Sequence, residues 1–181
     1  MSCRRRKVKT QQTSAFMSQS LANIVVHLIF STKYRRPLLR DDERNRLHAY
    51  IAGILTSHKS PMIEINSVTD HIHILFAQSK NLAPSKLVEQ IKSSSSGWIK
   101  DQHSWYADFA WQVGYGEFSV SPMEIEALRH YIRSQPEHHR KEDFQSEFRR
   151  ICQRNGVPLD ERYAWDAVPI GCVALSGLII P

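Results

Sequence analysis

The sequence predicts an α+β fold in which helices pack against an antiparallel sheet. Short runs rich in branched and aromatic residues alternate with segments whose apolar residues recur at helical spacing. Two of the short runs are separated by only a few residues, which fits a tight antiparallel connection. The chain has 181 residues, of which 41% are hydrophobic and 23% charged, and this suffices for one domain with a core of its own.

The first half of the domain shows two kinds of pattern, β-rich runs and helical spacing. Ser93–Ser96 are poor helix formers and are expected to interrupt the second helix. The predicted elements are a buried strand at 23–32, a basic loop at 33–37, a helix capped by Asp41 or Asp42 with Leu47, Ile51 and Leu55, a strand at 62–68, a strand at 70–76 joined to it through 67–70, and a helix at 84–100.

The second half predicts one further β region and one further helix. Residues 109–120 form a strand pair or a bulged strand, with glycines that give the backbone freedom. Ser121 caps the following helix, Pro122 suits its first position and Glu124 completes a capping box. The helix continues through Ile125, Leu128 and Ile132. This order of elements resembles the ferredoxin-like, or RRM-like, arrangement of a sheet and helices.

His71 and His73 are the most informative pair of residues in the chain. Side chains two apart on a strand share one face, so both imidazoles stand together while Ile72, Ile74 and Phe76 enter the core on the other face. Neutral imidazoles bind metals, and a rigid strand presets their spacing. His-x-His also arises by chance, and a histidine on a strand is commonly a solvated or hydrogen-bonded residue.

A tyrosine and a glutamine lie four residues apart on the last predicted helix and therefore share a face. Tyr131 is a candidate nucleophile, because a phosphotyrosine ester preserves the energy of a broken phosphodiester for rejoining. Gln135 offers an amide oxygen as third metal ligand beside His71 and His73. The alternative for Tyr131 is an ordinary core or surface tyrosine. The alternative for Gln135 is a solvated helix residue.

Charge and the two ends of the chain indicate the class of partner. The formal net charge of +6 suits nucleic acid most simply, although anionic membranes or solubility alone also fit it. Residues 1–20 are predicted to form a basic, disordered arm that contacts phosphates or has no role. Residues 167–181 form an apolar tail, too short to span a bilayer, that packs on a partner or is loosely ordered. The scattered cysteines are predicted to be free thiols in a reducing cytoplasm.

Five segments in a fixed order resemble the HUH single-tyrosine transposases of small insertion sequences, including the REP-associated tyrosine transposases. The resemblance runs from His27 to Asp166 and sets the catalytic domain at 21–166. The ordered set is highly specific, whereas His-x-His alone is not. The segments are HLIFSTK at 27–33, DHIHIL at 70–75, GYGEFSVS at 114–121, YIRSQ at 131–135 and DERYAWD at 160–166.

The resemblance implies an HUH-endonuclease fold and a role for each candidate residue. His71 and His73 are the paired metal ligands, Tyr131 is the nucleophile and Gln135 assists metal binding. The implied reaction cleaves and rejoins single-stranded DNA through a 5′-phosphotyrosine intermediate, without ATP, at element ends marked by a hairpin. The resemblance also implies a homodimer, in which the tyrosine helix of one subunit can serve the histidines of the other, and action at the nucleoid of a bacterial cytoplasm.

One residue departs from a simple helical site. Pro136 pushes Gln135 away from helical angles, so the helix is expected to end or kink there. His138 and His139, next to this break, are predicted to face the surface or the substrate and not a metal. His27 is predicted to be structural, because it lies on a buried strand. The divalent metal itself is Mg²⁺ or Mn²⁺, since two imidazoles suit transition metals as well.

A basic and aromatic cluster follows the first strand. In one interpretation its cations hold phosphates of single-stranded DNA and its ring stacks on a base. In the other, the segment is a solvated loop. The cluster consists of Lys33, Tyr34, Arg35 and Arg36. The four tryptophans, Trp98, Trp105, Trp111 and Trp165, are expected in the core.

The sequence therefore predicts a metal-dependent tyrosine transposase, or a domesticated relative, that acts on single-stranded DNA. One rival is a non-catalytic nucleic-acid-binding protein on the same fold, in which the basic face matters and the histidines do not. The other is a structural protein stabilised by zinc at His71 and His73.

Overall fold

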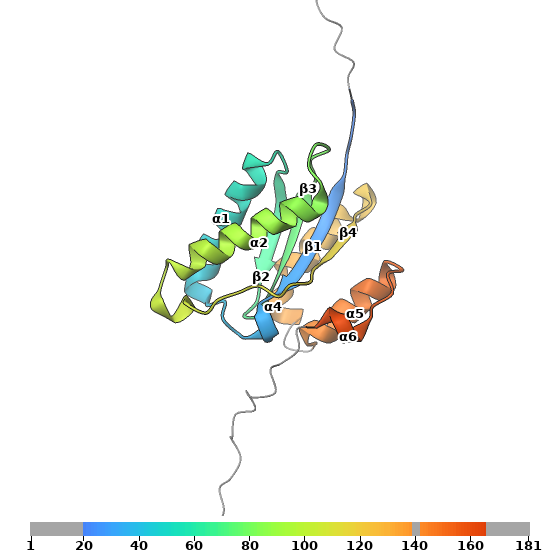
Figure 1. Ribbon diagram of the computed structural model, residues 1–181. Helices are drawn as coiled ribbons and strands as arrows, with labels where there is room; N and C mark the ends of the chain where they lie inside the picture. Colours follow the sequence, from blue (N-terminus) through green and yellow to red (C-terminus); the bar gives the residue numbers. More distant parts are fainter. Residues whose placement is uncertain (1–19, 139–141, 166–181) are drawn as a thin grey trace, which may run out of the picture.

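The structure, a computed structural model, describes residues 20–138 and 142–165. Its centre is an antiparallel four-stranded sheet with the strand order β2-β3-β1-β4 (Figure 1). The predicted α+β class is confirmed. The strands are β1 (Val25–Ser31), β2 (Met62–Ser67), β3 (His71–Ala77) and β4 (Gly116–Ser119).

Alternation along the central strands divides their side chains between the two faces of the sheet. Ile72 and Ile74 of β3 join the larger core cluster together with Leu28 of β1. His71 and His73 point to the opposite face, as predicted, but they are also fully buried. Helices cover both faces, so β1 is buried along its whole length and β3 along all but its last residue.

Helices α1 (Asp41–Ser57) and α2 (Pro84–Lys100) cover the face formed by Ile72 and Ile74. The predicted cap by Asp41 or Asp42 is wrong, because Arg40 takes the cap position and both aspartates lie in the first turn, where negative charge favours a helix. The predicted interruption of α2 is also wrong. Buried Ser95 stays in the helix because its hydroxyl donates to the Ile91 carbonyl at 2.6 Å.

The segment 109–120 contains less strand than the sequence predicts. Only β4 joins the sheet, and an isolated bridge pairs Trp111 with Thr32 beyond the end of β1. Trp111 is buried against Phe30, and its indole donates to Ser95 at 2.9 Å. Packing of this ring, instead of a regular ladder, therefore fixes the start of the segment.

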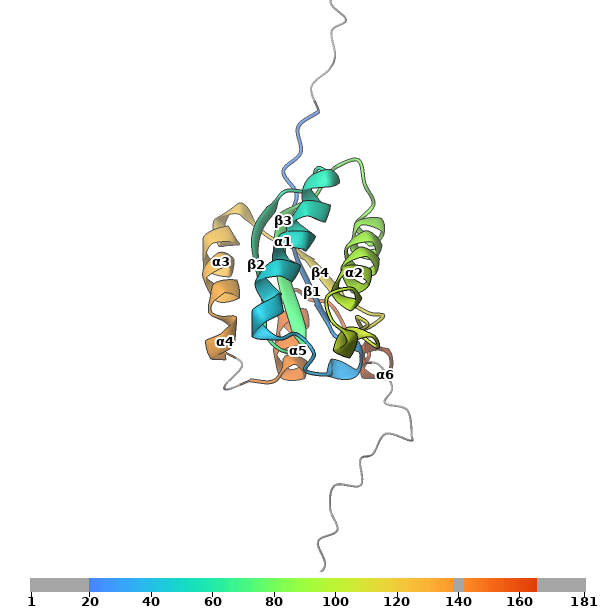
Figure 2. The same cartoon turned by 90° about the vertical axis from the view of Figure 1, so that its left-hand side faces the viewer.

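The second face of the sheet carries the C-terminal helices, and Figure 2 shows α3 and α4 on the side of the sheet opposite α2. Ser121 accepts a hydrogen bond from the Met123 amide, as the predicted cap requires. The predicted capping box is wrong, because among the described residues the Glu124 carboxylate pairs with Arg154 at 2.8 Å and makes no cap hydrogen bond. The remaining elements are η1 (Lys33–Arg35), η2 (Ser104–Tyr106), η3 (Pro122–Glu124), α3 (Ile125–Arg133), α4 (Gln135–His138), α5 (Phe144–Arg154) and α6 (Glu161–Ala164).

The sequence analysis did not predict α5, which completes this face. Asp143 caps α5 by accepting from the Ser146 amide at 2.7 Å. Phe144 and Phe148 then pack with Ile29 of β1 in a second core cluster. The helix is thereby fixed across the face that carries the two histidines.

The structure also bears on the predicted tails, on the cysteines and on membrane spanning. Both predicted tails, apart from Ser20, lie outside the described residues, as do Cys3 and Cys172, while Cys152 is a buried free thiol. Among the helices described, none combines the length and the apolar character needed to cross a membrane.

Candidate metal centre and tyrosine site

Strand β3 places the two predicted histidines side by side. The ring centroids of His71 and His73 lie 5.2 Å apart, and neither side chain is exposed. In the register with β1, His71 lies opposite Ser31 and His73 opposite Ile29. Both imidazoles therefore stand on a central strand, which pairs with β1 on one side and with β2 on the other.

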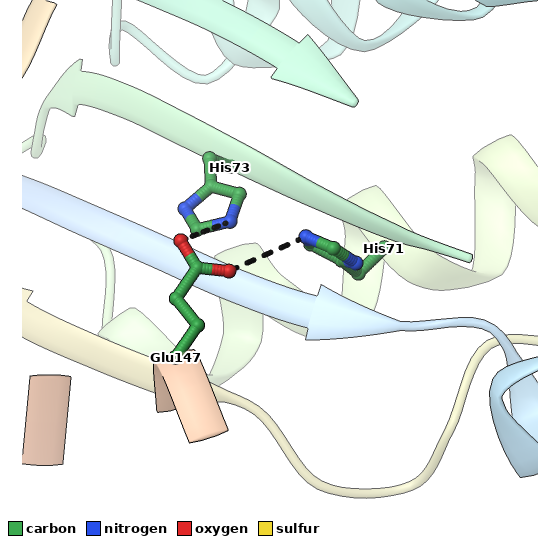
Figure 3. Close-up of side chains that lie close together, drawn as sticks. All are labelled: His71, His73 and Glu147. Atoms are coloured by element: carbon green, nitrogen blue, oxygen red, sulfur yellow. Dashed lines mark ion pairs between the residues drawn. The ribbon is translucent and has the colours of Figure 1, made fainter. Parts of the chain in front are cut away.

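Glu147 of α5 completes a cluster with these histidines (Figure 3). Its carboxylate lies between the imidazoles, with Oε2 3.5 Å from His71 Nε2 and Oε1 3.5 Å from His73 Nε2. One ligand atom from each of the three residues lies within 4.8 Å of the others. Glu147 is 1% exposed, so this is a buried charge placed directly against two metal-binding groups.

Tyr131 and Gln135 reach the same carboxylate. The Tyr131 hydroxyl donates to Glu147 Oε1, and Gln135 Nε2 donates to the same oxygen at 2.9 Å. The helix breaks at Ser134, so Tyr131 lies on α3 and Gln135 on α4, but both side chains still point at Glu147. Every member of this cluster comes from one chain.

The outer nitrogens of the histidines are held by neighbouring side chains. His73 Nδ1 lies 3.0 Å from His27 Nε2, and His71 Nδ1 lies 2.7 Å from Asp70 Oδ1. Such contacts fix ring orientation and tautomer, so that each Nε2 faces Glu147. His27 is buried, as its place on β1 predicts, and its contact orients the His73 ring.

The pKa values of the cluster reflect burial in the presence of one carboxylate. Burial, followed by the charge of Glu147, raises the pKa of Tyr131 to about 12, while Arg150 opposes this shift. Burial disfavours protonated His71, but hydrogen bonds to Asp70 and Glu147 outweigh it and raise the pKa of that imidazole. Burial and the neighbouring His73 lower the pKa of His27 well below its usual value.

The donor set fits a divalent cation. Two imidazole nitrogens and one carboxylate oxygen suit Mn²⁺ and related metals, whereas Mg²⁺ prefers more oxygen donors. Within the described part of the chain, the buried Oε1 of Gln135 makes no hydrogen bond, and this oxygen is available as a further ligand. The role of Gln135 as an accessory ligand stays a prediction, while Glu147 is an acid beside the histidines that the sequence analysis missed.

A sequence signal for Glu147 does exist. Phe144, Phe148 and Ile151 recur at helical spacing behind the capping residue Asp143. Glu147 falls on the same apolar stripe, where a carboxylate is rare unless it is paired or coordinates a metal. An acid in a core stripe, near a His-x-His strand, would have identified this residue.

The basic cluster 33–36 begins two residues after Ser31, the last residue of β1, which pairs with His71. Lys33 and Arg36 are exposed, and Tyr34 has a left-handed backbone with φ 59°. The Arg35 guanidinium lies 5.8 Å from the Trp165 ring, which packs against Phe144. The cluster is thus connected to the helix that carries Glu147.

The remaining candidate residues lie elsewhere. His139 falls outside the described residues, and the side chain of His138 is likewise outside the description. Trp111 is in the core and Trp98 packs against it, as expected. Trp105 is 51% exposed, so its expected core position is wrong: it stacks on His103 and lies under the Arg40 guanidinium at the surface.

Comparisons with known proteins agree on one family. A family model described as "Transposase IS200 like" matches residues 20–135. A candidate transposase from Deinococcus radiodurans R1 has 20% identity and a TM-score of 0.52, over 66% of this chain and 98% of that chain. A REP-associated tyrosine transposase bound to a REP hairpin has 14% identity and a TM-score of 0.52, over 70% of this chain and 74% of its own.

At these identities the two solved structures show a shared fold. The search of curated proteins gave no match. The family match is the stronger finding, because it spans more than half of the sequence and includes both histidines, the tyrosine and the glutamine. The chain therefore belongs to the family of IS200-like transposases.

Proposed function

We propose that this transposase cleaves and rejoins single-stranded DNA by transesterification, with Tyr131 as the nucleophile. One observation carries the proposal: the Tyr131 hydroxyl and the Nε2 atoms of His71 and His73 converge on the carboxylate of Glu147. A nucleophile and a set of metal ligands that meet in one chain are what metal-assisted phosphoryl transfer requires.

The proposed reaction exchanges one phosphodiester for another. The Tyr131 oxygen bonds to phosphorus, the bond from phosphorus to the 3′-oxygen breaks, the phenol loses a proton and the leaving 3′-oxygen gains one. The product is a 5′-phosphotyrosine and a free 3′-hydroxyl, which reverses the same exchange when strands are rejoined. No ATP is needed because the bonds made and broken are of one kind.

His71, His73 and Glu147 would hold the divalent metal, with the Gln135 oxygen as accessory ligand. A bound Mg²⁺ or Mn²⁺ supplies a Lewis acid that polarises the scissile phosphate. Glu147 also orients the Tyr131 hydroxyl through its hydrogen bond. Asp70 and His27 keep the ligand nitrogens directed at the site.

The basic cluster 33–36 is the proposed contact for the DNA backbone. It follows β1 at the end of the sheet that carries His71, and two of its cations are exposed. A solved relative is bound to a REP hairpin, which supports a hairpin beside the cleavage site as the substrate here. The homodimer implied by the resemblance, and action at the nucleoid of the cytoplasm, remain predictions.

The test is the formation of a denaturation-resistant adduct between the protein and DNA. The probe is a pool of labelled DNA hairpins with randomised single-stranded flanks, incubated with Mg²⁺ or Mn²⁺. Wild-type protein should form the adduct and Tyr131→Phe should not, although it still binds the DNA. Tyr50→Phe, at a tyrosine that stacks on Trp98 on the other side of the sheet, is the matched control.

Each other outcome selects a rival. Binding without an adduct for the wild type would indicate a non-catalytic nucleic-acid-binding protein. His71→Ala should impair adduct formation more than folding. Loss of the folded state in this variant would instead indicate a structural metal. Persistence of the adduct in Tyr131→Phe would remove Tyr131 as the nucleophile.

A further inference from the structure

A cavity of about 300 Å³ lies beside the tyrosine, between α3 and α5, with β1 and β4 as its floor. It is distinct from the metal cluster, because none of His71, His73 and Glu147 is among its lining residues. Its volume is at the lower end of the range for small-molecule sites, about 300–1,000 Å³. That size suits a single nucleotide unit.

The cavity opens on the nucleophile. Tyr131 lines it, and Arg150 Nη2, from the opposite wall, donates to the Tyr131 oxygen at 3.1 Å. His71, His73 and Glu147 are buried, whereas Tyr131 is only half-buried. Any phosphate that the Tyr131 oxygen attacks must therefore come within reach of the Arg150 guanidinium.

The walls combine apolar surface with cations. Val120, Leu128 and Ile151 give the apolar surface on which a base can lie. Arg150 and Arg154, one helical turn apart on α5, line the same side and are held by Glu142 and Glu124, each at 2.8 Å. Arginines beside an apolar surface suit a nucleotide, because each guanidinium can pair with a phosphate or stack on a base.

We propose that this cavity binds the nucleotide on the 3′ side of the scissile phosphate, with Arg150 on the phosphate itself. The inference rests on the proposed function. In an in-line displacement, the attacking and leaving oxygens lie on opposite sides of phosphorus. The leaving 3′-oxygen therefore carries its nucleoside away from Tyr131, while the nucleoside on the 3′ side stays attached to Tyr131 and lies on the cavity side.

The variant that tests the cavity is Ala127→Trp. Ala127 is an exposed residue of α3 that lines the cavity, so an indole at this position fills it without removing a hydrogen bond. His130→Trp is the matched control, because His130 is exposed on the same helix and does not line the cavity. Neither position belongs to the tyrosine or metal cluster.

The first measurement does not need catalysis. Deoxynucleoside 5′-monophosphates are titrated into the full chain, and methyl resonances are followed by NMR. Val120, Leu128 and Ile151 should shift saturably, with Ile54 of α1 unchanged, and inorganic phosphate should bind at least about tenfold more weakly because it lacks the base. Ala127→Trp should weaken nucleotide binding at least about tenfold, and His130→Trp should not.

The second measurement uses an oligonucleotide that forms the covalent adduct. An abasic residue on the 3′ side of the scissile phosphate should slow adduct formation by the wild type about tenfold, the loss expected for one stacked base. Ala127→Trp should form the adduct slowly on the intact strand, and the abasic residue should not slow adduct formation by this variant any further. An abasic residue on the 5′ side should have the smaller effect.

The two measurements separate this inference from the proposed function. Nucleotide binding in the cavity without any adduct would leave the binding site standing and refute the transesterification. The cavity site alone would be refuted if Ala127→Trp formed the adduct as fast as the wild type. It would also be refuted if the abasic residue slowed adduct formation as much in the variant as in the wild type. Nucleotide shifts confined to residues outside the cavity would do the same.

Discussion

At the scale of single residues, Glu147 connects the proposed metal ligands, His71 and His73, to the proposed nucleophile, Tyr131. Burying a carboxylate costs several kcal/mol unless charge and hydrogen bonds compensate it. Here the compensation comes from the Tyr131 hydroxyl, the Gln135 amide and the two facing imidazoles. A carboxylate held at that cost between two imidazoles supports the proposal that Glu147 is a metal ligand.

Replacing Glu147 should therefore weaken metal binding strongly. Glu147→Gln keeps the size of the side chain but removes the charge, and Mn²⁺ affinity should fall at least about tenfold, measured by isothermal titration calorimetry. Gln135→Ala should cost less, because it removes an accessory oxygen. Glu126→Gln, at an exposed residue of α3, should leave the affinity unchanged. A larger loss for Gln135→Ala than for Glu147→Gln would make the glutamine the principal third ligand.

The sequence could predict His71 and His73 because a strand has a period of two, and their shared face follows from that alone. It could not predict that this face is covered. The covering residue, Glu147, lies on a helix whose apolar stripe is short and comes after the segment with the strongest patterns. Glu147 and His73 lie 74 positions apart in the sequence, about half the length of the domain, and no local rule links such distant residues.

At the scale of elements, the approach of α5 to β4 depends on a glycine. A Cβ atom at Gly116 would lie 2.8 Å from the rings of both Phe118 and Phe148. Phe148 follows Glu147 on α5, and both rings are buried. The absence of a side chain at Gly116 therefore lets the helix sit close enough to place its carboxylate between the histidines.

Gly116→Ala should push α5 outward. Overpacking of this kind costs about 1–3 kcal/mol, and the free energy of unfolding in urea should fall by that amount. Mn²⁺ affinity should fall as well, because Glu147 moves with the helix. Gly53→Ala is the matched control: Gly53 lies within α1 with open space around it, so alanine should stabilise the protein by about 0.5–1 kcal/mol. Unchanged stability in Gly116→Ala would show that the two rings yield freely.

The joint between α1 and β2 carries a pH-dependent contact. His48 Nε2 lies 2.8 Å from Ser67 Oγ, and burial, with the nearby Arg44, lowers the pKa of His48 to about 4. Between pH 6.5 and 4, the unfolded chain binds a proton at this position and the native chain does not. Stability is therefore full above pH 6.5 and decreases as the pH falls through this window.

Urea unfolding at a series of pH values measures this effect. His48→Gln, which keeps a hydrogen-bonding side chain, should remove a loss on the order of 2 kcal/mol between neutral pH and pH 4. His130→Gln, at an exposed histidine of α3, should leave the wild-type pH profile unchanged. A profile in His48→Gln that is as steep as in the wild type would assign the pH dependence to other groups.

The elements themselves were predictable where one local pattern dominates. The strand at 70–76, the helix at 84–100 and the cap at Ser121 follow from alternation, helical spacing and a hydroxyl before proline. The segment 109–120 was not, because burial of Trp111 overrides the strand pattern near its start. Pro136 likewise acts differently from the local expectation. It lies in the first turn of α4, where its missing amide hydrogen is tolerated, and the helix breaks at Ser134 instead of at Gln135.

At the scale of the whole molecule, one chain brings together residues from a central strand and three separate helices. His71 and His73 come from β3, Tyr131 from α3, Gln135 from α4 and Glu147 from α5. Helix α3, which carries the tyrosine, packs on β2 and β3 of its own chain. The residues of the proposed site therefore lie together within one chain, and we predict that the site works in cis.

Mixing two inactive variants tests whether the site works in cis. Tyr131→Phe retains the metal ligands and His71→Ala retains the nucleophile, so a site made within one chain stays inactive in the mixture. A site shared between subunits of a dimer would regain about a quarter of wild-type adduct formation, because half of the randomly mixed dimers contain one intact combination. The expected result is no adduct after the variants are unfolded and refolded together. Recovery near that quarter would establish exchange of the tyrosine helix between subunits.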